Sequence, residues 1–354
     1  MYDVNKLVDK LYEKTTLSKE EWIYLIKNRN DVDKEHLFKL ARDRQQEYYG
    51  KDVYSRGLIE FSNYCRNNCL YCGIRRDNTN LLRYRLTKDE ILECAKEGYR
   101  LGYRTIVLQS GEDMHYTDDM ICDIVSSIKN LYKDVAITLS IGEKSYESYQ
   151  KYYDAGADRY LLRHESAVEK HYESLHPKQM SFKGRIKCIK DLKEIGYQVG
   201  CGFMVNAPGQ KDEYLADEML FLKEIDPAMV GIGPFIPHKD TPFKNEMAGT
   251  LDMTIFLLAC IRLSIPSVLL PATTALGTIS PIGRELGIKA GANVVMPNLS
   301  PVRVRKLYEL YDNKICTGDE AAQCIGCLKG RIESVGYNLV SARGDSKNPS
   351  YVRR

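Results

Sequence analysis

Three cysteines follow a β-rich run directly in the stretch Glu60-Phe-Ser-Asn-Tyr-Cys65-Arg-Asn-Asn-Cys69-Leu-Tyr-Cys72. Their CxxxCxxC spacing offers three thiolates, the usual protein ligands of iron–sulfur clusters. Three ligands leave one iron of a four-iron cluster without a protein ligand, and an open coordination position lets a metal site act on an outside molecule. Cys65, Cys69 and Cys72 are therefore predicted to hold a [4Fe-4S] cluster with one open iron, just after a strand.

Two other uses of these cysteines fit less well. Structural zinc sites usually show paired CxxC or Cys/His spacings, and the nearest histidines in sequence are His36 and His115. A disulfide would leave one thiol of the triplet over, and disulfides are rare in a reducing compartment. The aromatic Tyr71 stands directly before the last cysteine. This combination resembles the signature of radical S-adenosylmethionine (SAM) enzymes, in which SAM occupies the free iron and is cleaved to a 5′-deoxyadenosyl radical.

Composition sets the broad class. The 354 residues suffice for one large α/β domain with extensions, and 44% hydrophobic with 28% charged residues is ordinary globular usage. A net charge of +3 is too small to predict nucleic acid or a membrane surface as a partner. Apolar runs such as Ile255–Ile261 are too short to span a bilayer, and the first residues lack a signal-peptide core. We expect a cytoplasmic protein whose eleven cysteines serve metal or redox chemistry.

The pattern of predicted elements is that of a parallel α/β fold. Residues 1–50 have helical periodicity, and Ser18-Lys-Glu-Glu resembles a capping box. Strands are predicted at Leu58–Asn63, Thr105–Ser110, Ala136–Ser140, Arg159–Arg163, Val199–Val205, Val230–Phe235, Val268–Pro271 and Asn293–Met296. Helices are predicted at Asp33–Tyr49, Lys88–Glu97, Asp119–Leu131, Phe182–Ile195, Glu213–Glu224 and Met253–Leu263.

Eight βα units predict a complete (β/α)₈ TIM-type barrel over residues 51–300, with a doubly wound open sheet as the alternative. An N-terminal helical extension (1–50) and a C-terminal segment (301–354) flank it. The last twenty or so residues, rich in Arg, Ser, Gly and Asn, are expected to form a surface tail. Catalytic residues of such barrels lie at the carboxyl ends of the strands, and the cysteine motif follows the first predicted strand.

Polar residues stand at several of these strand ends. Gly111 permits close backbone approach, and Glu112 beside it could meet the amino group of SAM or simply cap a helix. Thr138 and Ser140 share one face of their strand, as ligands or as small residues of a barrel layer. Arg163 offers a planar fork to anions. Glu165 can accept from ribose hydroxyls, although a surface ion pair between these last two is the alternative.

A second cysteine group follows the predicted barrel. Cys316, Cys324 and Cys327 have CxxxxxxxCxxC spacing, which suits an auxiliary iron–sulfur cluster, zinc or free thiols. Two methionines, Met229 and Met296, begin and end their predicted strands and are by composition core fillers.

With these residues in view, the chain resembles the HydE family of [FeFe]-hydrogenase maturases over about residues 5 to 330. The strings that carry the resemblance are Glu60–Asn78, Thr105–Asp113, Ala155–Glu165, Met229–His238, Pro271–Thr274 and Asn293–Asn298. Such long ordered strings are far more specific than three cysteines.

The resemblance implies a SAM-cleaving barrel that helps to build the di-iron subcluster of the hydrogenase H-cluster from a small iron–cysteine complex with carbonyl and cyanide ligands. Implied SAM contacts are Tyr71, Gly111, Glu112, Ser140, Glu165 and Arg185. Implied substrate contacts are Thr138, Arg163, Met229, Thr273, Thr274, Met296, Tyr308 and Tyr311. Other maturation proteins and an electron donor are the implied partners, and the second cysteine group matches a site that only some family members keep.

Two alternatives stay open. A methylornithine synthase-like radical SAM mutase would need a site for an amino acid, whereas a non-catalytic iron–sulfur carrier would bind iron without cleaving SAM. Biotin synthase fits less well, because its sulfur-donating cluster needs several strand cysteines and Cys201 alone qualifies.

Overall fold

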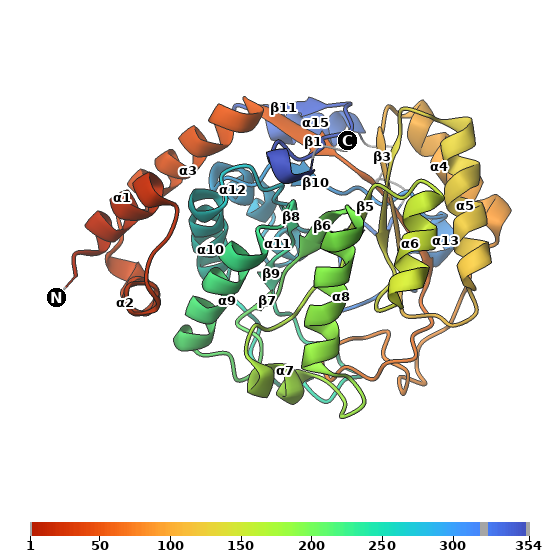
Figure 1. The fold of residues 1–354 in the computed structure, drawn as a ribbon, viewed down its shortest axis with the longest axis horizontal. Helices are drawn as coiled ribbons and strands as arrows, with labels where there is room; N and C mark the ends of the chain where they lie inside the picture. The colour runs from red at the N-terminus through yellow and green to blue at the C-terminus, as the bar shows by residue number, and fades with distance from the viewer. Residues whose placement is uncertain (1, 319–324, 352–354) are drawn as a thin grey trace.

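The N-terminal helices match the sequence prediction closely. This computed structural model describes residues 2–318 and 325–351. Helices α1 (Val4–Lys14), α2 (Lys19–Lys27) and α3 (Lys34–Tyr49) lie together on one side of the molecule (Figure 1). The predicted capping box of α2 is present, because the Ser18 hydroxyl accepts from the Glu21 N–H at 3.3 Å and the Glu21 carboxylate accepts from the Ser18 N–H at 2.9 Å.

A six-stranded parallel sheet forms the centre, which confirms the α/β class. Its strands follow the order β2 (Gly57–Ser62), β3 (Thr105–Ser110), β4 (Ala136–Ser140), β5 (Arg159–Leu161), β6 (Gln198–Cys201) and β8 (Met229–Val230). Helices lie around the outside of these strands (Figure 1). They are α4 (Lys88–Arg100), α5 (Asp118–Leu131), α6 (Tyr146–Asp154), α7 (Glu169–Leu175), α8 (Phe182–Ile195), α9 (Asp212–Ile225), α10 (Leu251–Ser264), α11 (Thr274–Ile279) and α12 (Gly283–Lys289).

Two smaller sheets complete the strand pairing. Strand β1 (Asp52–Ser55) pairs in parallel with β10 (Val294–Val295) and with β11 (Asn338–Val340), and β7 (Met204–Val205) pairs with β9 (Gly233–Pro234). Between β8 and β2 the pairing continues as single parallel bridges. These join Met229 to Leu269, Pro271 to Val294, and Leu58 to Asn298.

Three predicted strands differ from the observed ones for local reasons. Residues 268–271 make bridges but no ladder, because Pro271 has no N–H to donate. The strand predicted at 199–205 is broken at Gly202, which has φ +149° and whose Cβ, if present, would lie 2.1 Å from the Gly231 oxygen. The same close approach interrupts the strand predicted at 230–235, which the structure divides into β8 and β9.

The prediction of a surface tail is wrong, because residues 341–351 pack against the amino-terminal ends of the strands. The fully buried Arg159 donates to Asp345 Oδ1 at 2.6 Å and to the Arg343 carbonyl at 2.7 Å. Tyr351 is buried and donates from its hydroxyl to the Asp226 carbonyl at 2.7 Å. The C-terminal residues lie at the same end of the molecule as β1 (Figure 1). Among the described residues, no helix combines the length and apolarity needed to cross a bilayer.

Candidate active site

The cysteine loop leaves the carboxyl end of β2 and rests against Gly111. The Gly111 N–H donates to the Ser62 carbonyl at 3.1 Å. A Cβ at this position would lie 2.2 Å from the Tyr64 oxygen and 2.8 Å from Cys65 Cβ. The close approach that the sequence predicted at this glycine is therefore present, and it brings the carboxyl end of β3 against Cys65.

The three thiols share a partly buried environment. Burial raises the pKa of Cys65, Cys69 and Cys72, that of Cys72 to about 12, and the neighbouring thiolates add to the rise at Cys69. The described residues contain no three side chains gathered closely enough for a single metal ion. A four-iron cluster takes one thiolate per iron, so its sulfur ligands can stand further apart than those of one ion. Soft thiolates without carboxylates among them fit such a cluster, and metal binding would deprotonate them.

Glu112 is already held by protein donors. Its buried carboxylate accepts from Arg66 Nε at 2.9 Å and from the Glu143 N–H at 3.0 Å. Gly142, with φ +80°, makes room for it, because a Cβ there would lie 1.9 Å from Glu112 Cγ. The carboxylate is thus engaged on both oxygens, whereas backbone groups around Gly111 remain beside the cysteine loop.

Arg185 links two strand ends from helix α8. Its Nε donates to Glu143 Oε1 at 2.5 Å and its Nη1 to the Arg163 carbonyl at 2.8 Å. Burial lowers the pKa of Arg185, but the Glu143 carboxylate and other acidic neighbours raise it further, so the net pKa is raised and the guanidinium stays charged. The arginine that the resemblance implied at SAM therefore joins the loops after β4 and β5.

Glu165 carries an unpaired hydrogen-bond acceptor at the carboxyl ends of the strands. It has φ +62°, a left-handed conformation that costs energy for a non-glycine residue. Its N–H donates to the Gly202 carbonyl at 3.0 Å, and Arg163 Nη1 lies 3.9 Å from Oε1. The buried Oε2 has no hydrogen-bond partner in the described part of the chain. A buried acceptor left unpaired is costly, so this oxygen fits a ligand donor such as a ribose hydroxyl.

A buried histidine–glutamate pair lies behind Glu165. The His164 Nδ1 accepts from the Gly202 N–H at 3.2 Å, which places the imidazole proton on Nε2. That nitrogen donates to Glu218 Oε2 at 2.6 Å, and both side chains are fully buried. The pair ties α9 to the loop that presents Glu165. His164 directly follows the strand predicted at Arg159–Arg163, but no sequence pattern marks Glu218 as its partner.

Tyr71 is also fixed by a histidine. Its hydroxyl donates to His176 Nε2 at 3.1 Å, while His176 Nδ1 donates to the Tyr172 carbonyl at 2.8 Å. Burial lowers the pKa of His176 to about 3, so the ring is neutral near pH 7. The aromatic residue before the last cysteine is therefore held in one orientation.

Several implied substrate residues face the inside of the sheet. On β5 and the residues after it, Tyr160 and Leu162 are buried under helices, whereas Leu161 and Arg163 keep some exposure on the inner face. Thr138 Oγ1 and Thr273 Oγ1 are buried and accept or donate no hydrogen bond within residues 2–318 and 325–351. These two hydroxyls on the inner face can therefore form hydrogen bonds with a small polar ligand.

The methionines lie deeper, beside an arginine that sequence reasoning missed. Met229 Sδ accepts from Arg56 Nη1 at 2.9 Å. A thioether sulfur is a weak acceptor for a buried guanidinium. Arg56 Nε has no partner among the described atoms. Met296 packs against the same cluster as Met229. A single arginine between two β-rich runs was the only sequence signal for this interior cation.

The C-terminal segment supplies the predicted tyrosines. Tyr308 is buried, and its hydroxyl accepts from Gln109 Nε2 at 3.4 Å. Lys314 donates to the Tyr308 carbonyl at 2.7 Å and to the buried Glu60 at 2.5 Å, an ion pair not foreseen from sequence. Burial raises the pKa of Tyr311.

Two further predicted residues lie at element ends. Ser140 ends β4 opposite Gln109, and Thr274 begins α11.

The second cysteine group is only partly described. Cys316 has φ +64° and accepts from Arg284 Nη2 at 3.0 Å. Cys327 is exposed on α15 (Ile325–Glu333), and Cys324 lies outside the described residues. An auxiliary cluster at these cysteines stays a prediction.

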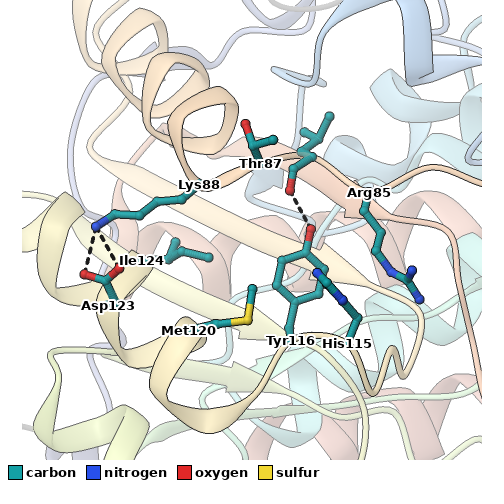
Figure 2. A pocket seen from close by; sticks show the side chains of 9 residues that line it. Arg85, Thr87, Lys88, His115, Tyr116, Met120, Asp123 and Ile124 are labelled. Carbon is teal, nitrogen blue, oxygen red and sulfur yellow. Dashed lines mark hydrogen bonds and ion pairs between the residues drawn. The ribbon is translucent and has the colours of Figure 1, made fainter.

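A separate cavity of about 350 Å³ opens outside the strands, between the starts of α4 and α5. Figure 2 shows Tyr116, His115 and Arg85 on one side of it and Lys88 with Asp123 on the other. Lys88 Nζ lies 2.8 Å from both Asp123 oxygens, and Tyr116 donates to the Leu86 carbonyl at 2.6 Å. None of the predicted site residues lines this cavity.

Comparison with known proteins agrees with this site. Residues 59–222 match the model of the radical SAM superfamily. The "[FeFe] hydrogenase maturase subunit HydE" of Thermotoga maritima is 52% identical over 302 residues, which cover 85% of this chain and 86% of the relative. A 3-methylornithine synthase of Methanosarcina acetivorans is 30% identical over 336 residues, covering 94% and 93%.

The solved structure of a methylornithine synthase (PylB) has a TM-score of 0.82 at 27% identity, covering 94% of this chain and 97% of that one. Its similarity extends over nearly the whole fold, including the strands that carry the cysteine loop. The identity to the maturase is much higher over most of both chains. This chain is thus a radical SAM enzyme and belongs to the HydE family of [FeFe]-hydrogenase maturases.

Proposed function

We propose that this enzyme reductively cleaves SAM and acts on a small iron–cysteine complex with carbonyl and cyanide ligands, during assembly of the di-iron subsite of the H-cluster. One observation carries the proposal. Buried polar atoms without partners face the inside of the sheet and its mouth, and they are Thr138 Oγ1, Thr273 Oγ1, Arg56 Nε and Glu165 Oε2. Most buried polar groups are hydrogen-bonded, so several unpaired atoms gathered around one interior indicate a ligand or water there.

We propose that Cys65, Cys69 and Cys72 hold the cluster, which supplies, when bound, the electron that cleaves the sulfonium of SAM. Glu165 would accept from the ribose of SAM. Arg185 holds the two loops around it through Glu143 and the Arg163 carbonyl. The Gly111 turn would present backbone groups to the amino acid end of SAM.

A closed barrel would suit this chemistry. The single bridges from β8 through Leu269 and Pro271 to β10, and from Asn298 to β2, support a complete (β/α)₈ ring. The strap of residues 341–351 covers its amino-terminal end. Such an enclosure would keep water away from a reactive primary radical and hold the substrate beside it.

The charges of the interior favour an anionic substrate. Arg56 is fully buried without a carboxylate partner, and Arg163 donates to the Gly231 carbonyl at 3.0 Å while keeping some exposure. Guanidinium groups and hydroxyls form charge-assisted hydrogen bonds with carboxylate and cyanide groups. We propose Met229, Met296, Tyr308, Tyr311 and Thr274 as further walls of the same cavity.

The second candidate is a mutase acting on an amino acid such as lysine, which the likeness to methylornithine synthase favours. A lysine ammonium needs a carboxylate to receive it. Glu60 is the inward carboxylate of β2, and Lys314 already neutralises it at 2.5 Å. Glu165 Oε2 is also unpaired, but we assign it to the ribose of SAM, so the unpaired charge left for the substrate is that of Arg56, which disfavours a cationic side chain.

The deciding experiment is anaerobic reconstitution with iron and sulfide, followed by reduction with SAM and either the synthetic iron–cysteine dicarbonyl cyanide complex or lysine. The expected result is 5′-deoxyadenosine, with a new paramagnetic iron signal only when the iron complex is present. Stimulation by lysine instead would favour the mutase. Iron binding without any SAM cleavage would favour a carrier. Thr138→Val with Thr273→Val should reduce the response to the iron complex while SAM cleavage alone persists.

We also propose that the protein works in the cytoplasm with other hydrogenase maturation proteins and an electron donor. The 52% identity to a maturase supports these partners. A second cluster at Cys316, Cys324 and Cys327 would be accessory, so its loss should leave SAM cleavage largely intact.

A further inference from the structure

Arg83 holds both arms of the cysteine loop with one guanidinium. Its Nη1 donates to the Asn63 carbonyl at 2.5 Å and to the Ile74 carbonyl at 2.9 Å. Its Nη2 donates to the Arg75 carbonyl at 2.6 Å and to the Asn78 carbonyl at 3.2 Å. Asn63 precedes the first cysteine by two residues and Ile74 follows the last by two. The guanidinium therefore closes the base of the loop that carries all three cysteines.

The geometry of these bonds requires an arginine. A planar guanidinium presents several N–H groups in a fixed fork, so it can reach carbonyls on two backbone segments at once. A lysine ammonium is a compact point charge on a flexible stem and cannot hold the same set in one plane. The loop forms no helix or strand between Asn63 and Asn78, so its shape depends on contacts of this kind.

Arg83, like Arg75, has no carboxylate partner among the described residues, whereas the other arginines of this part of the chain do. Arg66, Arg76 and Arg85 each have a carboxylate partner, Glu112, Asp77 and Asp113, at 2.9, 2.9 and 2.6 Å. Arg85 lies at the edge of the outer cavity in Figure 2.

Within the described residues the hydrogen bonds of Arg83 go to backbone carbonyls and its guanidinium lies 6.0 Å from the centre of the Tyr64 ring, while no carboxylate forms an ion pair with it. A charge that is partly buried and unneutralised acts on its surroundings more strongly than a screened ion pair.

We propose that Arg83 is a positioning residue for the cluster, which fixes the cysteine loop and raises the reduction potential of the cluster held there. This rests on the proposed cluster at the three cysteines. Reduction adds one negative charge to the site, and a nearby uncompensated cation favours the more negative state. Net charge and hydrogen bonding around a cluster are among the properties that set its potential.

Three variants separate the two roles. Arg83→Gln removes the charge, Arg83→Lys keeps the charge but loses the fork, and Arg76→Gln removes a charge from the same loop at an exposed ion pair. Each is reconstituted anaerobically, its iron and sulfide are counted, and its midpoint potential is measured without SAM by redox titration followed by electron paramagnetic resonance.

Arg83→Gln is expected to lower the ratio of reduced to oxidised cluster about tenfold at a fixed potential, which for a one-electron couple corresponds to 59 mV. Arg83→Lys should keep the wild-type potential but bind about half the iron, because its loop is less well held. Arg76→Gln should match wild type in both measurements.

A loaded Arg83→Gln cluster with the wild-type potential would overturn the electrostatic role. Wild-type iron content in both Arg83 variants would overturn the positioning role. If Arg83→Gln retains no iron, Arg83→Lys decides alone. A lower reduction potential in Arg83→Lys would refute the electrostatic role, and wild-type iron content in it would refute the positioning role. Absence of iron in the wild-type protein would instead refute the proposed cluster itself.

Discussion

The contact between Gly111 and the cysteine loop gives the sharpest prediction. Gly111→Ala would place a methyl group 2.2 Å from the Tyr64 oxygen and 2.8 Å from Cys65 Cβ. Ordinary contacts between such atoms begin near 3.4 Å, so the loop must move by about 1 Å. Inserting a methyl group into a packed site typically costs about 1–3 kcal/mol. If the loop moves to relieve this cost, the population competent to bind the cluster falls roughly 5- to 150-fold.

The assay is the iron and sulfide content after reconstitution, together with thermal unfolding of the metal-free protein. Gly184→Ala is the matched control, because the new methyl on α8 would meet Ser181 Cβ at 3.3 Å, a far milder contact. We expect Gly111→Ala to lose most of its iron while the metal-free protein still unfolds cooperatively. Wild-type iron content and SAM cleavage in Gly111→Ala would refute the reasoning.

Four further predictions concern single side chains. Cys69→Ser should abolish SAM cleavage and Cys324→Ser should leave it largely intact, as measured by 5′-deoxyadenosine; cleavage retained in the first variant would contradict the cluster assignment. Glu165→Gln should weaken SAM binding about tenfold, because a hydrogen bond to a charged group contributes about 1.5–3 kcal/mol and one to a neutral amide about 0.5–1.5 kcal/mol; calorimetry would measure the dissociation constant, and an unchanged value would remove Glu165 from the site. Glu218→Ala should lower the free energy of unfolding by about 1–3 kcal/mol, because it leaves the buried Nε2–H of His164 without its acceptor; denaturant unfolding would measure it, and an unchanged free energy would contradict the account. His176 has a pKa lowered from 6.5 to about 3, mainly by burial. As the pH falls, His176 is protonated in the unfolded chain before it is protonated in the folded one. Its contribution to the free energy of unfolding is therefore fully present above pH 6.5 and is lost as the pH drops towards 3. His176→Gln should flatten this pH dependence of stability in the metal-free protein, and an identical pH profile would exclude the histidine as its cause.

The elements that were predicted best are those whose bounds depend on residues close in sequence. Helix α8 begins and ends where the sequence indicated, because Ser181 caps its first turn and Gly196 takes φ +106° at its end. Strands β3 and β4 also match residue for residue. In each case the deciding residues lie within a few positions of the element.

Contacts distant in sequence explain what could not be predicted. The partner of Glu60 is Lys314, 254 positions away, and no local pattern marks either residue as a member of a pair. The C-terminal strap has the composition of a surface tail, yet Asp345 finds a buried arginine 186 positions earlier. The cysteine motif was readable because its three ligands lie in one short loop. The groups facing the interior come from many strands, and the family resemblance was needed to gather them.

The pairing of β1 has a consequence for how the chain is made. This strand, at residues 52–55, lies between two strands that follow it by some 240 and 285 positions. At 5–20 residues per second, both of its edges stay unpaired on the ribosome for roughly 12 to 48 seconds, and one edge stays unpaired for longer. Unpaired edges invite wrong partners. The nascent chain therefore passes through a long interval in which a chaperone that shields this short strand would raise the yield of folded enzyme.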